Sequence, residues 1–182
     1  QHLEMTRTFA NRFNRLYNVP YFPEPVAYNF GENLVKIPGL DGNLKMSKSD
    51  NENSAIFLAD SPEVIRKKVM RAVTDSGPVD PSQPRSQGVA NLFQLMSYFS
   101  SPDVYRHFDD AYASGTIRYG DMKKQLAEDM VRFIAPIREK AEAIRTDEKY
   151  LRELMEKGAE KARKSALATI ELVREAIGLN YY

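Results

Sequence analysis

The stretch LKMSKSDNENS, residues 44–54, decides how the chain is interpreted, because its order fits neither a helix nor a strand. Lys45 and Lys48 stand three positions apart, Ser47 and Ser49 are interleaved with them, and an acidic, amide-rich run follows. Glycine and aspartate just before the stretch signal turns. The sequence therefore predicts an exposed polar loop, called the lysine–serine loop below.

Two lysines with interleaved hydroxyls suit a polyphosphate ligand. A lysine ammonium is a compact charge on a flexible stem, and serine hydroxyls and loop N–H groups add neutral donors. Positive charge placed where a leaving pyrophosphate develops negative charge stabilises the transition state more than the ground state. Gly39 and Gly42 would let the loop open and close. The alternative is a solvated surface loop that is basic by chance.

Composition limits the other possibilities. The chain has 182 residues, enough for one large or two small domains, and its 42% hydrophobic content allows a core. A net charge of +1 argues against a broadly basic nucleic-acid surface, although local patches remain possible. The sequence has no cysteine, and its two histidines, His2 and His107, are far apart, so we predict no metal site. The lack of cysteine fits a reducing cytoplasm, and no apolar run approaches the ~18 residues of a membrane span.

Hydrophobic periodicity predicts a mainly helical chain. Residues 3–17 form an amphipathic helix, and residues 25–30 and 33–40 are short extended pieces and candidate strands. Ser61 followed by Pro62 marks a helix start, so a boundary lies near residues 59–61. Helices are expected after it over roughly residues 62–73, 89–99, 102–115, 121–144 and 147–177. We expect a kink at Pro136 and a break or bend at Gly158.

A basic cluster follows the boundary. Helical spacing puts Lys67 and Arg71 on one face with Lys68 beside them, while Arg66 points nearer the flank. We expect Lys67, Lys68 and Arg71 to contact nucleic-acid phosphates. The alternative is a solvated helix face.

The five residues from Lys45 to Ser49 match the second signature of class I aminoacyl-tRNA synthetases residue for residue. Four further segments resemble the tryptophanyl-tRNA synthetases: QHLEMTRTFANRFNRLYN, VKIPGLDG, IRKKVMRAVTD and GAEKARKSALATIELVREAIGL. The likeness covers essentially the whole chain. The chain resembles the C-terminal half of a bacterial-type tryptophanyl-tRNA synthetase.

The resemblance implies a fold and a division into domains. Residues 1–60 would be the C-terminal remnant of a Rossmann-type α/β catalytic domain that carries the loop. Residues 61–182 would be an all-helical anticodon-binding domain, whose last helix is a candidate to pack back on the catalytic domain.

The resemblance also implies an activity: joining tryptophan to ATP, with Mg2+, as an adenylate, then transferring it to the tRNA for tryptophan. Lys45 and Lys48 would be catalytic. The expected ATP contacts are Ile37, Lys45, Met46, Ser47, Lys48 and Ser49, and the expected tRNA contacts are Lys67, Lys68 and Arg71. The family implies a cytoplasmic homodimer without a membrane.

Three alternatives stay open at this point: a tyrosyl-tRNA synthetase, a non-catalytic helical RNA-binding module and a helical protein-interaction domain. The sequence holds no His-Ile-Gly-His-like signature and starts at Gln1 inside a helical pattern. We therefore expect a chain cut from something longer, with the tryptophan pocket mostly upstream, and no activity from this chain alone.

Overall fold

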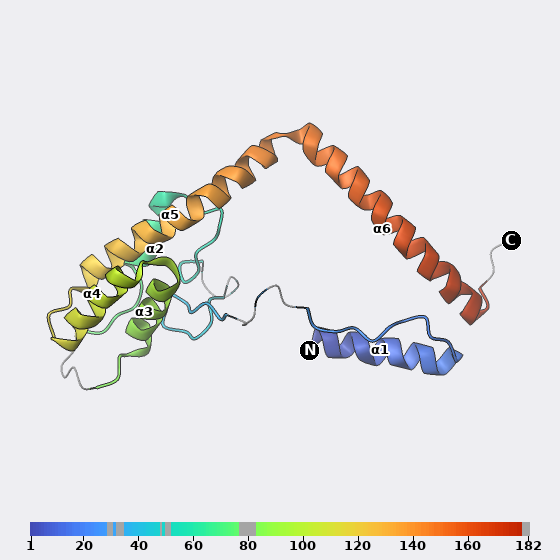
Figure 1. Ribbon diagram of the computed structural model, residues 1–182, viewed down its shortest axis with the longest axis horizontal. Helices are drawn as coiled ribbons and strands as arrows, with labels where there is room; N and C mark the ends of the chain where they lie inside the picture. Colours follow the sequence, from blue (N-terminus) through green and yellow to red (C-terminus); the bar gives the residue numbers. More distant parts are fainter. Residues whose placement is uncertain (29–30, 32–34, 48, 50–51, 77–82, 180–182) are drawn as a thin grey trace. The chain divides into compact units, whose positions relative to one another are not determined.

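The computed structural model in Figure 1 describes residues 1–28, 31, 35–47, 49, 52–76 and 83–179. Within these residues the regular structure is helical: α1 (His2–Tyr17), α2 (Pro62–Met70), α3 (Gln87–Phe99), α4 (Pro102–Ala113), α5 (Tyr119–Thr146) and α6 (Glu148–Ile177). The predicted, mainly helical class is confirmed. The candidate strands are wrong where they can be judged, since residues 25–28 and 35–40 have irregular backbone. Their remaining residues lie outside the described ranges.

The chain groups into two compact units, one made of residues 1–34 and 144–182 and the other of residues 35–143. Residues 35–60, which we expected to belong with residues 1–34, group with the following helices instead. The assignment of functional domains at residue 60 stays a prediction.

The unit of residues 35–143 owes two of its helices to the same local signal. Ser61 and Ser101 each precede a proline, and their hydroxyls accept hydrogen bonds from the amides of Val64 and Val104 at 3.3 and 3.4 Å. A hydroxyl cap of this kind satisfies an amide that has no partner inside the helix, and proline at the first position is already set for helical φ.

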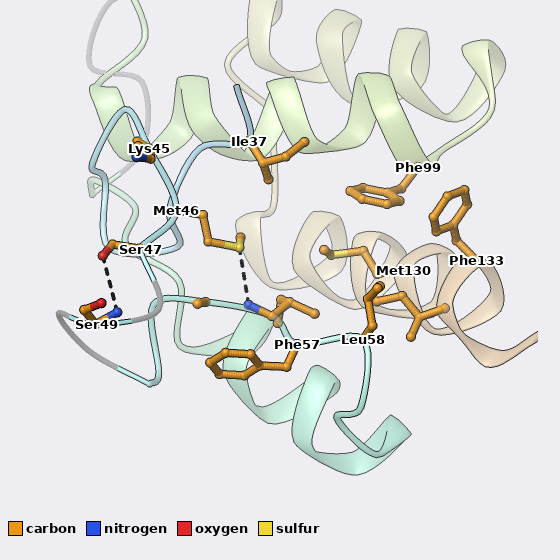
Figure 2. Close-up of a pocket in the computed structure, with 13 residues that line it drawn as sticks. Ile37, Lys45, Met46, Ser47, Ser49, Phe57, Leu58, Phe99, Met130 and Phe133 are labelled. Atoms are coloured by element: carbon orange, nitrogen blue, oxygen red, sulfur yellow. Dashed lines mark hydrogen bonds between the residues drawn. The ribbon is translucent and has the colours of Figure 1, made fainter. Parts of the chain in front are cut away.

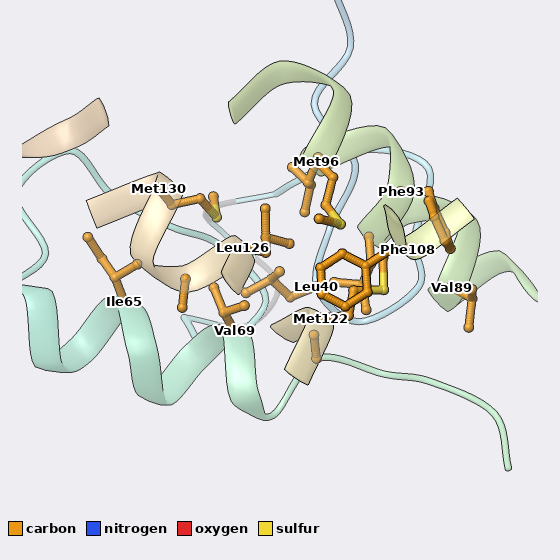
Figure 3. Close-up of a cluster of buried hydrophobic side chains, with 14 of the residues drawn as sticks. Leu40, Ile65, Val69, Val89, Phe93, Met96, Phe108, Met122, Leu126 and Met130 are labelled. Atoms are coloured by element: carbon orange, nitrogen blue, oxygen red, sulfur yellow. The ribbon is translucent and has the colours of Figure 1, made fainter. Parts of the chain in front are cut away.

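A single apolar core joins α2, α3, α4 and the first half of α5. Figure 3 shows Val69, Met96, Leu126 and their neighbours meeting between the helices. Burying each such side chain contributes about 1.5–3 kcal/mol relative to exposure. Leu40, from the segment before the lysine–serine loop, is 4% exposed in the same core. The base of the loop is therefore attached to the helices by burial. Val73, which follows the end of α2, is 49% exposed and lies outside this core.

Two expected interruptions concern the long helices. α6 runs through Gly158, so the expected break there is wrong. A helical glycine costs about 1 kcal/mol relative to alanine, too little to interrupt a helix of 30 residues. α5 also continues through Pro136, and the kink stays a prediction.

In the other unit, the chain after α1 is fixed to that helix. Asn14 exchanges two hydrogen bonds with the backbone of Phe22, and Arg7 donates to the carbonyl of Pro25 at 2.7 Å. The ring of Phe13 meets that of Phe22 edge to face, with centroids 5.1 Å apart. These contacts satisfy backbone groups in a segment that prolines keep out of regular structure.

Candidate functional site

The segment that enters the lysine–serine loop, residues 35–43 (the incoming arm), ends in a tight turn. The Gly39 amide donates to the Asn43 carbonyl at 3.0 Å, and Gly42 has a φ of 89°, which favours glycine. Asn91 of α3 donates from Nδ2 to the carbonyls of Gly39 and Asn43 at 3.0 and 2.8 Å. The turn is therefore held on α3 by a side chain that is 2% exposed.

Met46 joins the incoming arm to residues 52–60 (the returning arm), which comprise the end of the loop and the residues that follow it. Its amide donates to the Ile37 carbonyl at 2.7 Å, and its sulfur accepts from the Ile56 amide at 3.4 Å, drawn as a dashed line in Figure 2. Met46 is half-buried while its neighbour Lys45 is exposed. The methionine thus anchors the loop and leaves the adjacent lysine free to meet a ligand.

Lys68 departs from the expectation that it is free to contact nucleic acid. It lies on the inner side of α2 and is 8% exposed. Its Nζ donates to the Ala55 carbonyl at 3.0 Å and to Asp60 Oδ2 at 2.8 Å, and lies 4.7 Å from the centre of the Phe57 ring. Lys68 is buried because the returning arm covers it with a carboxylate and a carbonyl. Helical spacing alone predicted an exposed position.

A pocket of about 600 Å³ opens beside the loop. Figure 2 shows Lys45, Ser47 and Ser49 at one end of it and Phe99 and Phe133 at the other. The remaining lining residues are Ile37, Met46, Ala55, Ile56, Phe57, Leu58, Met130 and Ile134. An apolar floor with polar donors at one end suits a flat ring joined to an anionic tail.

Five of the six predicted ATP contacts therefore lie together at this pocket, and the sixth, Lys48, lies outside the described residues. Asn91 and the apolar floor were not among the site residues predicted from the sequence. Asn91 did carry a signal, because it is an amide within the apolar stripe of a helix, where a buried polar group needs partners.

The outer face of α2 keeps the rest of the basic cluster. Lys67 is exposed on α2, and Arg71, the residue directly after the end of the helix, is exposed beside it. Arg66 instead forms a two-bond pair with Glu128 of α5, from Nε to Oε1 at 2.7 Å and from Nη2 to Oε2 at 3.0 Å. Hydrogen bonding to Arg66 lowers the pKa of the Glu128 carboxyl below its usual value. Two of the three predicted phosphate contacts thus remain available, and the flanking arginine is already paired.

The described residues offer neither a cluster of metal ligands nor a membrane-spanning helix. No group of three or more histidine, cysteine, aspartate or glutamate side chains there could hold a metal ion. Within the same residues, no helix has the length and apolar character needed to cross a membrane.

Residues 1–135 match the family model described as tRNA synthetases class I (W and Y). The chain belongs to this family. It is 51% identical to the tryptophan–tRNA ligase of Porphyromonas gingivalis over 98% of its own length and 54% of that protein. It is 39% identical to the enzyme of the same name from Helicobacter pylori strain 26695, over 98% of this chain and 53% of the relative.

Solved structures of the class I synthetases agree with the sequence match. A tryptophanyl-tRNA synthetase from Campylobacter jejuni, complexed with ADP and tryptophan, superposes with a TM-score of 0.76 at 28% identity, over 98% of this chain and 54% of that one. The synthetase from Mycoplasma pneumoniae gives a TM-score of 0.70 at 29% identity, over 99% and 55% of the two chains. The chain thus spans about half the length of the relatives that it matches.

Proposed function

We propose that these residues are part of a tryptophan–tRNA ligase, in which they supply the loop that handles ATP and the helices that meet tRNA. One observation carries the proposal: Lys45, Ser47 and Ser49 of the Lys-Met-Ser-Lys-Ser string form the polar end of a pocket, with Met46 anchored and Lys45 exposed beside it. The names of the relatives, and the ADP and tryptophan in the Campylobacter structure, support the same substrates.

At this pocket the roles divide by chemistry. Lys45 and Lys48 hold the triphosphate and then the departing pyrophosphate, and Ser47 and Ser49 add neutral donors. Ile37 and the Met46 side chain offer an apolar surface to the adenine. Mg2+ enters with ATP as part of the substrate, and this chain's own contribution is to position the phosphates.

The nucleic-acid partner is the tRNA for tryptophan. Lys67 and Arg71 contact its phosphates from the outer face of α2, and the helical part from residue 61 onward reads the anticodon. The complete protein acts as a homodimer in the cytoplasm. The exposed charges of Lys67 and Arg71 support the phosphate contacts, and membership of the family supports tRNA as the partner.

The test is amino-acid-dependent exchange of pyrophosphate into ATP by the full-length protein that contains these residues. We expect exchange with tryptophan and none above background with tyrosine. Exchange with tyrosine alone would replace the proposal by the other specificity of the family. Binding of tRNA without exchange for either amino acid would indicate a non-catalytic RNA-binding protein.

A further inference from the structure

We propose that Lys68 is a positioning residue for the lysine–serine loop, and that it fixes the returning arm so that Lys45 and Ser47 face the pocket. The inference rests on the proposed function for its kinetic consequence. Its structural content concerns only contacts within residues 35–143.

One buried ammonium holds the returning arm at two points. Lys68 Nζ donates to the Ala55 carbonyl and to the carboxylate of Asp60, and the same Asp60 oxygen accepts from the Phe57 amide at 3.0 Å. The side chains of Lys68 and Asp60 are 9% and 14% exposed. Residues 55, 57 and 60 are thereby tied to one position on α2.

The returning arm passes this constraint to the loop. Ile56, next to Ala55, donates to the sulfur of Met46, and the Ser54 carbonyl accepts from the Leu40 amide at 3.0 Å. A shift of the returning arm therefore moves Met46, and with it the adjacent Lys45 and Ser47. Ala55, Ile56 and Phe57 also line the pocket, so the same shift changes its shape.

Core stability alone does not require a lysine at this position. Lys68 sits among the buried positions of α2, between Ile65 and Val69. Replacing a buried ion pair by apolar side chains of similar volume is often neutral or stabilising. The ammonium instead fixes the position of the returning arm, because its N–H groups donate to one specific carbonyl and one specific carboxylate of that arm.

The experiment compares Lys68→Met with wild type in the full-length protein by tryptophan-dependent pyrophosphate exchange. Methionine keeps the length of the side chain and removes its donors. We expect kcat to fall at least about tenfold, because misplacing a catalytic group by a fraction of an ångström is costly. The KM for tryptophan should stay within about twofold, since the tryptophan pocket is assigned elsewhere. Lys68→Arg should recover part of the rate, because a guanidinium can reach both acceptors.

Lys123→Met is the matched control. Lys123 is 9% exposed and donates to the Ala72 carbonyl at 2.7 Å, so its loss also removes a buried, hydrogen-bonded ammonium, but one with no bond to the returning arm. An equal loss of kcat in this control would overturn the proposal, because it would show a general effect of destabilisation. Unchanged kcat in Lys68→Met would overturn it as well.

A double-mutant cycle identifies the route of the effect. If Lys68 acts through the loop, Lys68→Met combined with Lys45→Ala should be no more than about threefold slower than the slower single variant. Multiplying losses would show independent effects and overturn the proposal. Should Lys68→Met fail to give the helical circular dichroism of the wild type, Asp60→Asn carries the same tests, because it weakens the ionic contact with little change of shape.

Failure of the proposed function can be told apart from failure of this inference. If the wild-type protein shows no exchange of pyrophosphate into ATP, the readout becomes the rate at which the backbone amides of Ile56 and Phe57 exchange hydrogen with solvent. Faster hydrogen exchange at both amides in Lys68→Met than in Lys123→Met supports the positioning role of Lys68. Equal rates of hydrogen exchange in the two variants overturn it.

Discussion

The side-chain nitrogen of Asn91 lies 3.0 Å from the carbonyl oxygen of Gly39, 52 positions earlier in the chain, and donates a hydrogen bond to it. The same nitrogen reaches the Asn43 carbonyl at 2.8 Å, and Gln87 donates to the Asn91 oxygen at 2.8 Å. One buried amide therefore closes the turn before the lysine–serine loop, and both its nitrogen and its oxygen are hydrogen-bonded.

Asn91→Leu should destabilise the protein by about 1–3 kcal/mol, because leucine fits the volume and leaves two carbonyls without their donor. Urea unfolding followed by circular dichroism measures the change. Gln94→Leu on the same helix is the control, since Gln94 is exposed and its replacement should stay within about 0.5 kcal/mol of wild type. Equal stability of the two variants would show that the turn does not depend on Asn91.

The lysines of the loop should matter for rate rather than for tryptophan binding. In the full-length protein, Lys45→Ala and Lys48→Ala should each slow adenylate formation about 30- to 1000-fold, equivalent to about 2–4 kcal/mol of transition-state stabilisation. Pre-steady-state measurement of adenylate formation, together with tryptophan binding at equilibrium, separates the two effects. Lys124→Ala, an exposed lysine of α5, should leave both unchanged. A normal rate in the loop variants would reduce the loop to a surface feature.

On the outer face of α2, replacing Lys67 and Arg71 together with alanine should weaken tRNA binding almost regardless of sequence. Two lost phosphate contacts should flatten the slope of log affinity against log salt by about 2 units. Titration of labelled tRNA at several salt concentrations tests this. The control joins Lys124→Ala with Arg106→Ala, because both cations already pair with carboxylates of their own helices. Parallel salt lines for wild type and the α2 variant would show that the face only meets solvent.

How far the sequence could predict the structure depends on whether the signal is local. The starts of α2 and α4 were predictable, because a hydroxyl and a proline within two positions determine them. The burial of Lys68 on the inner side of α2 was not predictable from the sequence. It depends on Asp60 and Ala55, which the returning arm brings over the helix. Spacing alone places Lys68 beside Lys67, and only the tertiary contact separates the two roles.

At the site, too, only the local part of the signal was visible in the sequence. The Lys-Met-Ser-Lys-Ser string could be read as a phosphate-binding loop because residue types carry that chemistry. The apolar floor formed by Phe99, Met130 and Phe133 could not be assigned to the site, because helical periodicity explains these residues equally well as core. A pocket that joins a loop to helices distant in sequence appears only once the packing is known.

Tyr119 makes the stability of the protein depend on pH in the alkaline range. Its hydroxyl donates to Asp75 Oδ1 at 2.9 Å, and burial, followed by this hydrogen bond, raises the pKa of the phenol above its ordinary value of about 10. Above pH ~10 the unfolded chain loses the Tyr119 proton while the folded chain keeps it. The folded state then binds more protons than the unfolded state, so stability falls as pH rises.

Tyr119→Phe should remove this component. At pH 7 the free energy of unfolding of the variant should be lower than that of wild type by no more than about 1.5 kcal/mol, since one hydrogen bond contributes about 0.5–1.5 kcal/mol net. Between pH 9 and pH ~11 its free energy of unfolding should fall less steeply than that of wild type, as measured by urea unfolding at each pH. Burial lowers the pKa of Lys123, which changes stability with pH in the opposite direction, and comparing the two proteins cancels that contribution. Parallel pH curves for wild type and Tyr119→Phe would show that the phenol ionises alike in both states.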